Sequence, residues 1–172
     1  MPDNACNLAD NDIELINTYF HSLGSRKYTV ASPNDIASVA LNCLDGNVTE
    51  TQPFAGTFNV FCGTDWGTDI PSTTLDANGR TLSLTDLLGV TAYSQSNCMQ
   101  ACLQYNHWSN QLKLPNAMLC RSIHFAANMG NGLAANRANC WIKNGSPVDS
   151  TMYKGVEGPG VFSAALVSGT SQ

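Results

Sequence analysis

The sequence predicts an α+β protein stapled by disulfide bonds, on three observations. Apolar residues recur at helical spacing as far as about residue 46, and period-two alternation dominates from residue 57 onward. Seven cysteines in 172 residues are typical of a disulfide-bonded protein. A chain of this length forms one hydrophobic core rather than two. We therefore expect a helical N-terminal extension over residues 1–56, packed on a mostly β body over residues 57–172.

Two helices are expected in the extension. Ile13, Ile16 and Phe20 lie at helical spacing within residues 11–23. A second short helix is expected from the Ser32-Pro33-Asn34-Asp35 start, which supplies an N-cap, a proline at the first helical position and a carboxylate in the first turn. This helix would end near Gly46.

The body is predicted to consist of strands and a single helix. Residues 57–62 alternate apolar and polar side chains and are followed by Gly63, as expected for a strand. Ser94 or Ser96 can cap a helix that brings Cys98 and Cys102 onto one inward face, because residues four apart are neighbours on a helix. Further strands are expected over residues 120–126, 139–143 and 161–168.

The cysteines favour disulfides over a metal site. The chain has no C-x-x-C pair, and its three histidines have no H-x3-H spacing, so neither pattern typical of zinc is present. Because seven is odd, at most three bridges can close within the chain and one thiol is left over. Their number and spacing alone do not choose the pairs. The seven are Cys6, Cys43, Cys62, Cys98, Cys102, Cys120 and Cys140.

Composition excludes some functions. Eight Lys and Arg against thirteen Asp and Glu give a formal charge of −5 with no basic cluster, which disfavours nucleic acid as a partner. Charged residues make up only 12% of the chain, a neutral-polar composition typical of secreted proteins. No apolar run approaches the roughly 20 residues of a membrane span. We expect a secreted or cell-wall protein.

Catalytic and metal-binding patterns are weak. His107 or His124 could take part in a nucleophile-base set, but the chain has no G-x-S-x-G, H-E-x-x-H or P-loop motif, and no paired carboxylates in a patterned context. Asp65, Asp69 and Asp76 lack the spacing of a calcium loop, and Asp65 is expected to brace the turn after the first strand. The sequence therefore favours a protein that is not an enzyme and holds no cofactor or metal.

Four short segments of the body follow one another in a recognisable order. They are Cys62-Gly63-Thr64-Asp65-Trp66, Cys98-Met99-Gln100-Ala101-Cys102, Cys120-Arg121-Ser122-Ile123-His124-Phe125 and Asn139-Cys140-Trp141-Ile142-Lys143. Over roughly residues 57–168 this series resembles the PAN/apple domain family, especially its fungal extracellular branch. The resemblance implies a curled antiparallel sheet with one helix packed across it. The specificity lies in the order of the four elements rather than in any one of them.

The resemblance also implies a disulfide plan, in which Cys98 pairs with Cys140 and Cys102 with Cys120. It does not settle the remaining three cysteines. We favour Cys43 with Cys62, because that bond would tie the second N-terminal helix to the first strand, and Cys6 with Cys62 is the alternative. Cys6 left unpaired would allow either a monomer or a Cys6-linked dimer.

PAN domains are recognition modules, so the resemblance implies binding of a polysaccharide, a glycoprotein or another extracellular protein at a cell wall or host surface. Sugars stack on flat rings beside amides and carboxylates, so we expect the binding residues to be Trp66, Asp65, Tyr105, His107 and Trp108. Trp66 could instead cover the sheet edge, and Trp108 lies in a more polar context. Alternatives are a protein-protein or self-assembling effector, and a secreted hydrolase with an unrecognised site.

Two sequons fit a secreted glycoprotein. Asn47-Val48-Thr49 and Asn144-Gly145-Ser146 match the N-glycosylation pattern, so Asn47 and Asn144 are predicted attachment sites.

Overall fold

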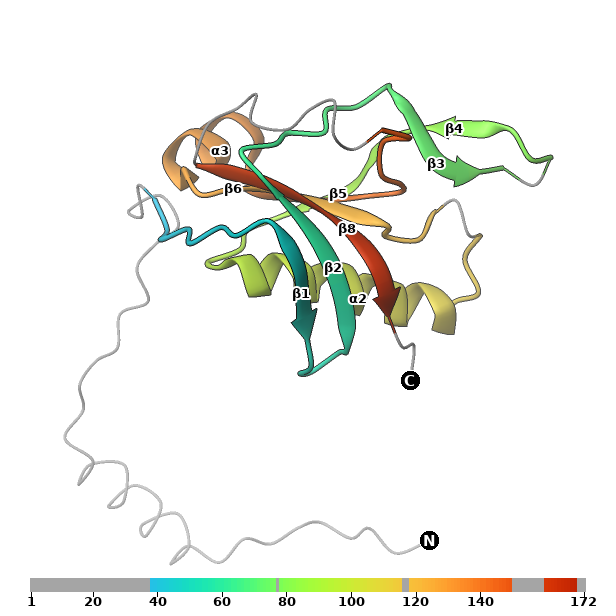
Figure 1. Ribbon diagram of the computed structural model, residues 1–172, viewed down its shortest axis with the longest axis horizontal. Coiled ribbons are helices and arrows are strands. Elements are labelled where there is room, and N and C mark those ends of the chain that lie inside the picture. Colours follow the sequence, from blue (N-terminus) through green and yellow to red (C-terminus); the bar gives the residue numbers. More distant parts are fainter. Residues whose placement is uncertain (1–37, 77, 116–117, 150–159, 170–172) are drawn as a thin grey trace, which may run out of the picture. The chain divides into compact units, whose positions relative to one another are not determined.

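The computed structural model describes residues 38–76, 78–115, 118–149 and 160–169 (Figure 1). The expected helix over residues 11–23, the start of the second helix and Cys6 lie outside these residues. What is described is a mixed α+β structure, as the sequence predicts.

Its main element is a six-stranded sheet in the order β1-β2-β8-β6-β7-β5, in which every neighbouring pair is antiparallel. The central strands come from distant parts of the chain, since β2 pairs with β8 and β8 with β6. The six strands are β1 (Gly46–Glu50), β2 (Gly56–Cys62), β5 (Asp86–Val90), β6 (Ser122–Ala126), β7 (Cys140–Lys143) and β8 (Val161–Gly169).

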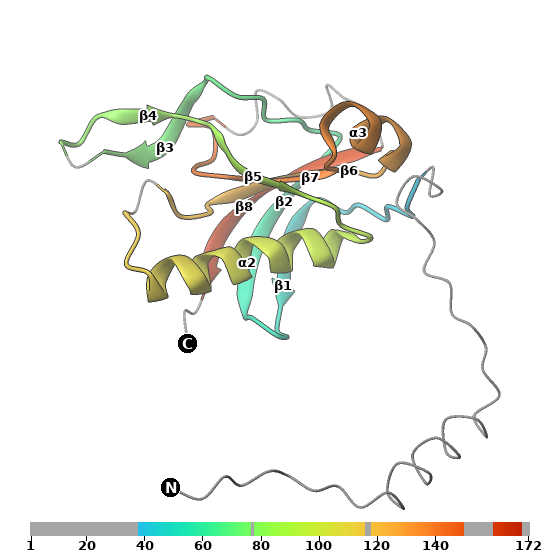
Figure 2. The same ribbon diagram turned by 180° about the vertical axis from the view of Figure 1, so that it is seen from behind.

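Helix α2 (Gln95–Gln111) lies across one face of this sheet (Figures 1 and 2). Its N-cap is Ser94, whose side chain accepts a hydrogen bond from the Asn97 amide at 3.1 Å, as one of the two predicted caps. Met99 and Leu103 are buried on the sheet side. They pack against alternate residues of the strands, among them Phe58, Val60, Ile123, Phe125, Ile142 and Phe162. This apolar burial stabilises the packing of the helix on the sheet.

Three disulfide bonds fix the arrangement, and each is a predicted pair. Cys98 bonds Cys140 of β7, and Cys102 bonds Cys120 just before β6, with Cα–Cα distances of 5.7 Å and 5.5 Å. Cys43 bonds Cys62 at the end of β2, with a Cα–Cα distance of 5.8 Å. The first two attach α2 to the sheet, and the third attaches the segment before β1.

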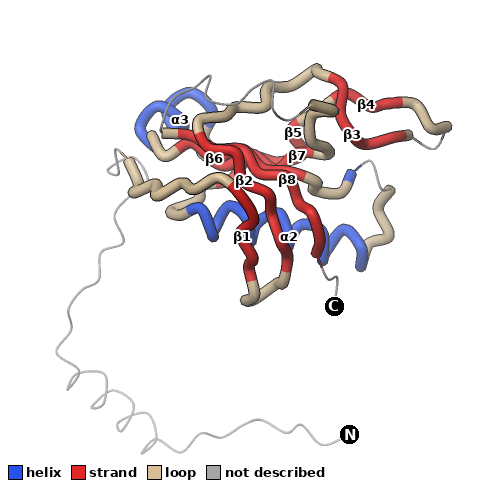
Figure 3. The backbone as a smooth tube through the Cα atoms, viewed as in Figure 1, coloured by secondary structure: helices blue, strands red, loops and turns tan. Residues whose placement is uncertain are grey.

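The other face of the sheet is covered by different parts of the chain (Figure 3). A two-stranded hairpin, β3 (Pro71–Leu75) and β4 (Thr81–Ser83), and the short helix α3 (Met129–Asn136) lie on the side opposite α2. The hairpin approaches the turn after β7 closely, because a Cβ on Gly145 would stand 2.7 Å from Ser72. Only glycine fits there without movement of the hairpin.

The prediction of a second helix is wrong for residues 38–45, the part of that helix that the structure describes. Residues 38–45 are not helical, and β1 follows at once, so the sheet begins at Gly46 rather than at residue 57. Tertiary contacts override the local pattern here: the Val39 amide donates to the Ala127 carbonyl at 2.9 Å, and the disulfide holds Cys43 beside β2. The bond from Cys43 therefore joins β2 to a non-helical segment and not to a helix.

We predict that Asn139→Ala destabilises the fold by about 3 kcal/mol, at roughly 1 kcal/mol per lost hydrogen bond. The Asn139 side chain is fully buried and bonds the amide and carbonyl of Ala92 and the carbonyl of Ala126 at 2.8, 2.9 and 3.1 Å. Chemical denaturation measures the change. Asn47→Ala, at an exposed position of β1, is the matched control and should cost under about 0.5 kcal/mol. Equal effects of the two variants would contradict this role.

Removing single disulfides should also be measurable. The Cys98–Cys140 bond spans 42 residues and the Cys43–Cys62 bond spans 19. Chain entropy therefore predicts losses of about 4 and about 3 kcal/mol for the respective double-alanine variants in denaturation experiments. A smaller loss for the longer loop would show that the bond does not act through the unfolded chain.

Candidate functional site

The strand alternation gives β7 two different faces. Cys140 and Ile142 point toward α2, so Trp141 and Lys143 lie on the opposite face. In the register of the sheet, Trp141 stands between His124 of β6 and Gly89 of β5. The rings of His124 and Trp141 are stacked, with centroids 5.3 Å apart and planes inclined by 29°. A Cβ on Gly89 would stand 2.9 Å from the Ala138 side chain but 3.5 Å from the indole, so Ala138 is the neighbour that a side chain there would crowd.

His124 is held by the loop that follows β2. Its Nδ1 lies 3.5 Å from Oδ1 of Asp65 and 3.4 Å from Oγ of Ser163 on β8. The imidazole is buried, whereas the Asp65 side chain is 39% exposed. Asp65 thus reaches from solvent to a buried ring, which agrees with its predicted role in bracing the turn.

A second ion pair lies nearby. The Lys143 side chain is only 3% exposed, and its Nζ donates to Oδ1 of Asp86 at 2.5 Å and to the Gly67 carbonyl at 3.2 Å. A buried ammonium group needs such partners, because an unpaired charge in this environment is strongly destabilising. Asp86 is 37% exposed and so stands at the rim.

These groups line one cavity of about 290 Å³, open to solvent. Its wall combines an indole, an imidazole, two carboxylates, an ammonium and an amide, contributed by Trp141, His124, Asp65, Asp86, Lys143 and Asn136. The volume is near the lower limit of ligand pockets, roughly 300 Å³. Such a cavity suits one small polar group, and its charges are already paired within the protein.

Burial lowers the pKa of His124 below its ordinary value of 6.5, since the charged ring would lose its hydration. The Asp65 carboxylate opposes this shift, the Lys143 charge adds to it, and Asp86 and the Thr64 carbonyl raise the pKa again. Burial dominates, so the imidazole is neutral at pH 7.

The cluster does not have the geometry of a hydrolase triad. In a triad the serine and the carboxylate bond opposite nitrogens of the imidazole, whereas Ser163 and Asp65 both approach Nδ1. Ser163 is fully buried; its hydroxyl donates to the Thr64 carbonyl and accepts from the Trp66 amide at 3.0 Å and 3.3 Å. The hydroxyl is therefore used in positioning the loop.

The prediction of a ligand-facing Trp66 is wrong. Trp66 is fully buried and packs against Phe61 with ring centroids 5.2 Å apart. Among the described residues its indole nitrogen is a buried polar atom with no hydrogen-bond partner. The alternative weighed from the sequence placed this ring over the sheet edge, whereas the ring packs against β2 and the Trp66 amide donates to Ser163 of β8, both of them inner strands. Of the two neighbours, only Asp65 reaches a cavity.

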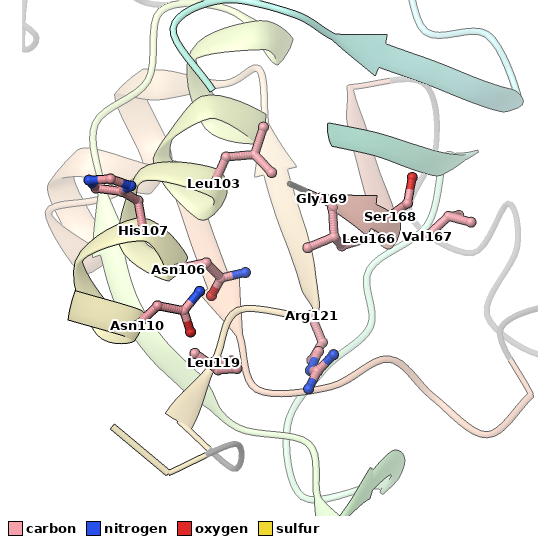
Figure 4. Close-up of a pocket in the computed structure, with 10 residues that line it drawn as sticks. All are labelled: Leu103, Asn106, His107, Asn110, Leu119, Arg121, Leu166, Val167, Ser168 and Gly169. Atoms are coloured by element: carbon pink, nitrogen blue, oxygen red, sulfur yellow. The ribbon is translucent and has the colours of Figure 1, made fainter. Parts of the chain in front are cut away.

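The other three predicted binding residues lie on α2, and so on the opposite face of the sheet from Asp65. Tyr105 is half-buried against the core and Trp108 is 57% exposed. His107 contacts the rings of Phe54 and Trp108, with centroids 5.0 Å and 5.3 Å away. It also lines a separate cavity of about 170 Å³, beside the end of β8 (Figure 4). The structure therefore divides the predicted set between two places.

The two sequons differ in access. Asn144 is 5% exposed, its amide nitrogen donates to the Ser83 carbonyl at 3.1 Å, and its oxygen accepts from the Thr85 amide at 2.8 Å. This asparagine holds β4 and β5 to the end of β7, so its prediction as a glycosylation site is wrong for the folded chain. Asn47 is exposed on the edge strand β1 and stays a predicted site.

Trp141 and Lys143 are not among the predicted site residues, because a place beside the bonded Cys140 suggests the core. The signal was present in the sequence: next to an inward cysteine, the neighbouring strand residues must face outward. Asp86 had no such signal, since its place depends on the pairing of β5 with β7.

Comparison with known proteins gives no relative: no family model, no curated protein and no solved structure matches the chain. Within the described ranges, no group of three or more His, Cys, Asp or Glu side chains could hold a metal ion. No helix in that part of the chain combines the length and apolar character needed to cross a membrane.

We predict that His124 titrates below 6.5 in an NMR pH series, and that Asp65→Asn lowers its pKa further by removing the opposing charge. Because the unfolded chain binds this proton more readily than the folded protein, His124 contributes stability above pH 6.5 that is lost as the pH falls through the lowered pKa. His124→Gln should flatten that limb of a stability–pH curve. An His124 pKa above 6.5 would contradict burial as the dominant cause.

Proposed function

We propose that this chain is a secreted, non-enzymatic recognition module of PAN/apple type that binds carbohydrate through the cavity around Trp141. The fold supports the family part of the proposal. The two disulfides carried over from the resemblance, Cys98–Cys140 and Cys102–Cys120, join one helix to an antiparallel sheet. Three disulfides fit an oxidising compartment, and so secretion to a cell wall or host surface.

The observation that supports a sugar as the ligand is the set of side chains around Trp141. An indole lies at the wall of a small cavity whose other walls offer carboxylates, an ammonium and an amide. A sugar ring has an apolar C–H face that stacks on an indole and hydroxyls that both donate and accept hydrogen bonds. Asp65 and Asp86 would accept from hydroxyls, and Asn136 and Lys143 would donate to them.

Pairing of the charges favours a neutral sugar over a charged ligand. Lys143 is neutralised by Asp86, and Asp65 lies against a neutral His124. A ligand with its own charge would have to compete with the Asp86 carboxylate for Lys143, which would uncover a buried ion. Neutral wall polymers, β-glucan, chitin, mannan or cellulose, are therefore the class to test.

Retention on insoluble polymers tests the proposal. We expect the oxidised protein to be retained on at least one of the four polymers, and Trp141→Ala to bind about ten-fold more weakly, as expected for a lost stacking contact of about 1.4 kcal/mol. Asn136→Ala should also weaken retention, and this exposed residue at the end of α3 can be changed without disturbing the sheet.

Trp108→Ala is the matched control, because it removes an exposed indole from the other face of the protein. Each variant is checked for folding by circular dichroism. Retention that survives in Trp141→Ala and Asn136→Ala but is lost in Trp108→Ala would move the sugar site to α2. Absence of retention on every polymer would contradict the carbohydrate proposal and favour a protein partner.

A further inference from the structure

A groove on another side of the protein carries an arginine that forms no ion pair with any residue the structure describes. Two cavities, of about 170 Å³ and 350 Å³, share Arg121 and Leu166 among their lining residues. One lies between the second half of α2 and the end of β8, and the other beside the β3 strand. We call the pair the Arg121 groove, and define it by Asn110, Arg121, Leu166, Val167, Thr73 and Leu75.

The backbone of Arg121 is hydrogen-bonded to neighbouring segments of the sheet region, and the residue is exposed to solvent. Its amide donates to the Lys143 carbonyl and its carbonyl accepts from the Leu166 amide, both at 2.8 Å. Figure 4 shows Arg121 at one end of the first cavity, with its guanidinium directed away from Leu103 and Leu166. Within the described residues it forms no ion pair, and no Asp or Glu lines either cavity. In a chain of net charge −5, this is a local positive site that is accessible to solvent.

The rim of the groove is apolar and exposed. Val167 lines one cavity and Leu75 the other, and they are 63% and 54% exposed. Each cavity thus offers one exposed aliphatic side chain beside the Arg121 that both cavities share, and a ligand with apolar groups can contact it.

We propose that the Arg121 groove binds an extended peptide segment of a partner protein, in which a carboxylate side chain pairs with Arg121 and apolar side chains on either side contact Leu75 and Val167. Charge complementarity selects the carboxylate, since guanidinium and carboxylate form two parallel hydrogen bonds. The aliphatic rim selects a peptide over an acidic sugar, which would present hydroxyls to Leu75 and Val167. This site is independent of the cavity around Trp141.

An NMR titration of the 15N-labelled protein tests it. The probe is acetyl-Leu-Glu-Leu-amide, and the matched neutral probe is acetyl-Leu-Gln-Leu-amide. We expect the glutamate peptide to shift the amide signals of Leu75, Asn110 and Val167, and the glutamine peptide to bind about ten-fold more weakly, as for one charge-assisted hydrogen-bond pair.

Arg121→Gln should lose the preference for glutamate. Arg80→Gln, at an exposed arginine that lines neither cavity, should keep it. Equal affinity of the two peptides, unchanged binding by Arg121→Gln, or no shift in these signals would overturn the proposal. Shifts at the same amides with trigalacturonate but not with the glutamate peptide would overturn the choice of a peptide in favour of an acidic glycan.

Discussion

The two disulfides between α2 and the sheet are the constraint on which the other features depend. Cys98 and Cys102 lie one turn apart on the helix. Cys98 bonds Cys140 of β7, and Cys102 bonds Cys120, just before β6. Once Cys140 is held against the helix, the pleat of β7 obliges Trp141 and Lys143 to face the other way. The bonds that close the core therefore also determine which side chains are left for the second face.

The second face differs from the face that packs on α2, because several of its buried side chains are polar. His124, Lys143 and Ser163 are all shielded from solvent, and each contacts the loop after β2, through Asp65, the Gly67 carbonyl and the Thr64 carbonyl respectively. Because ions and hydrogen bonds act more strongly in such an environment, these contacts place the loop after β2 accurately. The arrangement gives a cavity of fixed shape whose polar groups are already oriented.

Sequence patterns predicted most of what depends on short-range geometry. The shared face of Cys98 and Cys102 follows from helical spacing, Ser94 is one of the two serines expected to cap the helix, and the alternation of residues 57–62 places a strand correctly. The patterns failed where distant segments decide: residues 38–45 have helical spacing but are held extended by the disulfide at Cys43 and a bond to Ala127. Likewise, the sequence left open whether Trp66 faces a ligand or covers the sheet, and only the fold shows that this ring is buried.

The same difference between local patterns and contacts of distant segments applies to the candidate site. Asp65 could be found because it follows a strand, but the indole that it faces across His124 comes from a strand far along the chain. The sheet order β8-β6-β7-β5 brings these residues together, and antiparallel order among non-consecutive strands is not encoded in any local window.

The Cys43–Cys62 bond also has a mechanical consequence. Residues 43–62 form a covalent loop that contains β1 and the turn to β2. Tension applied from the N-terminal side of Cys43 passes through the two sulfur atoms directly to the end of β2, which is hydrogen-bonded along its length to β8. The edge strand β1 carries none of that load and cannot be peeled from the sheet by it. A protein held at a surface through its N-terminal side would thus resist pulling with its central strands.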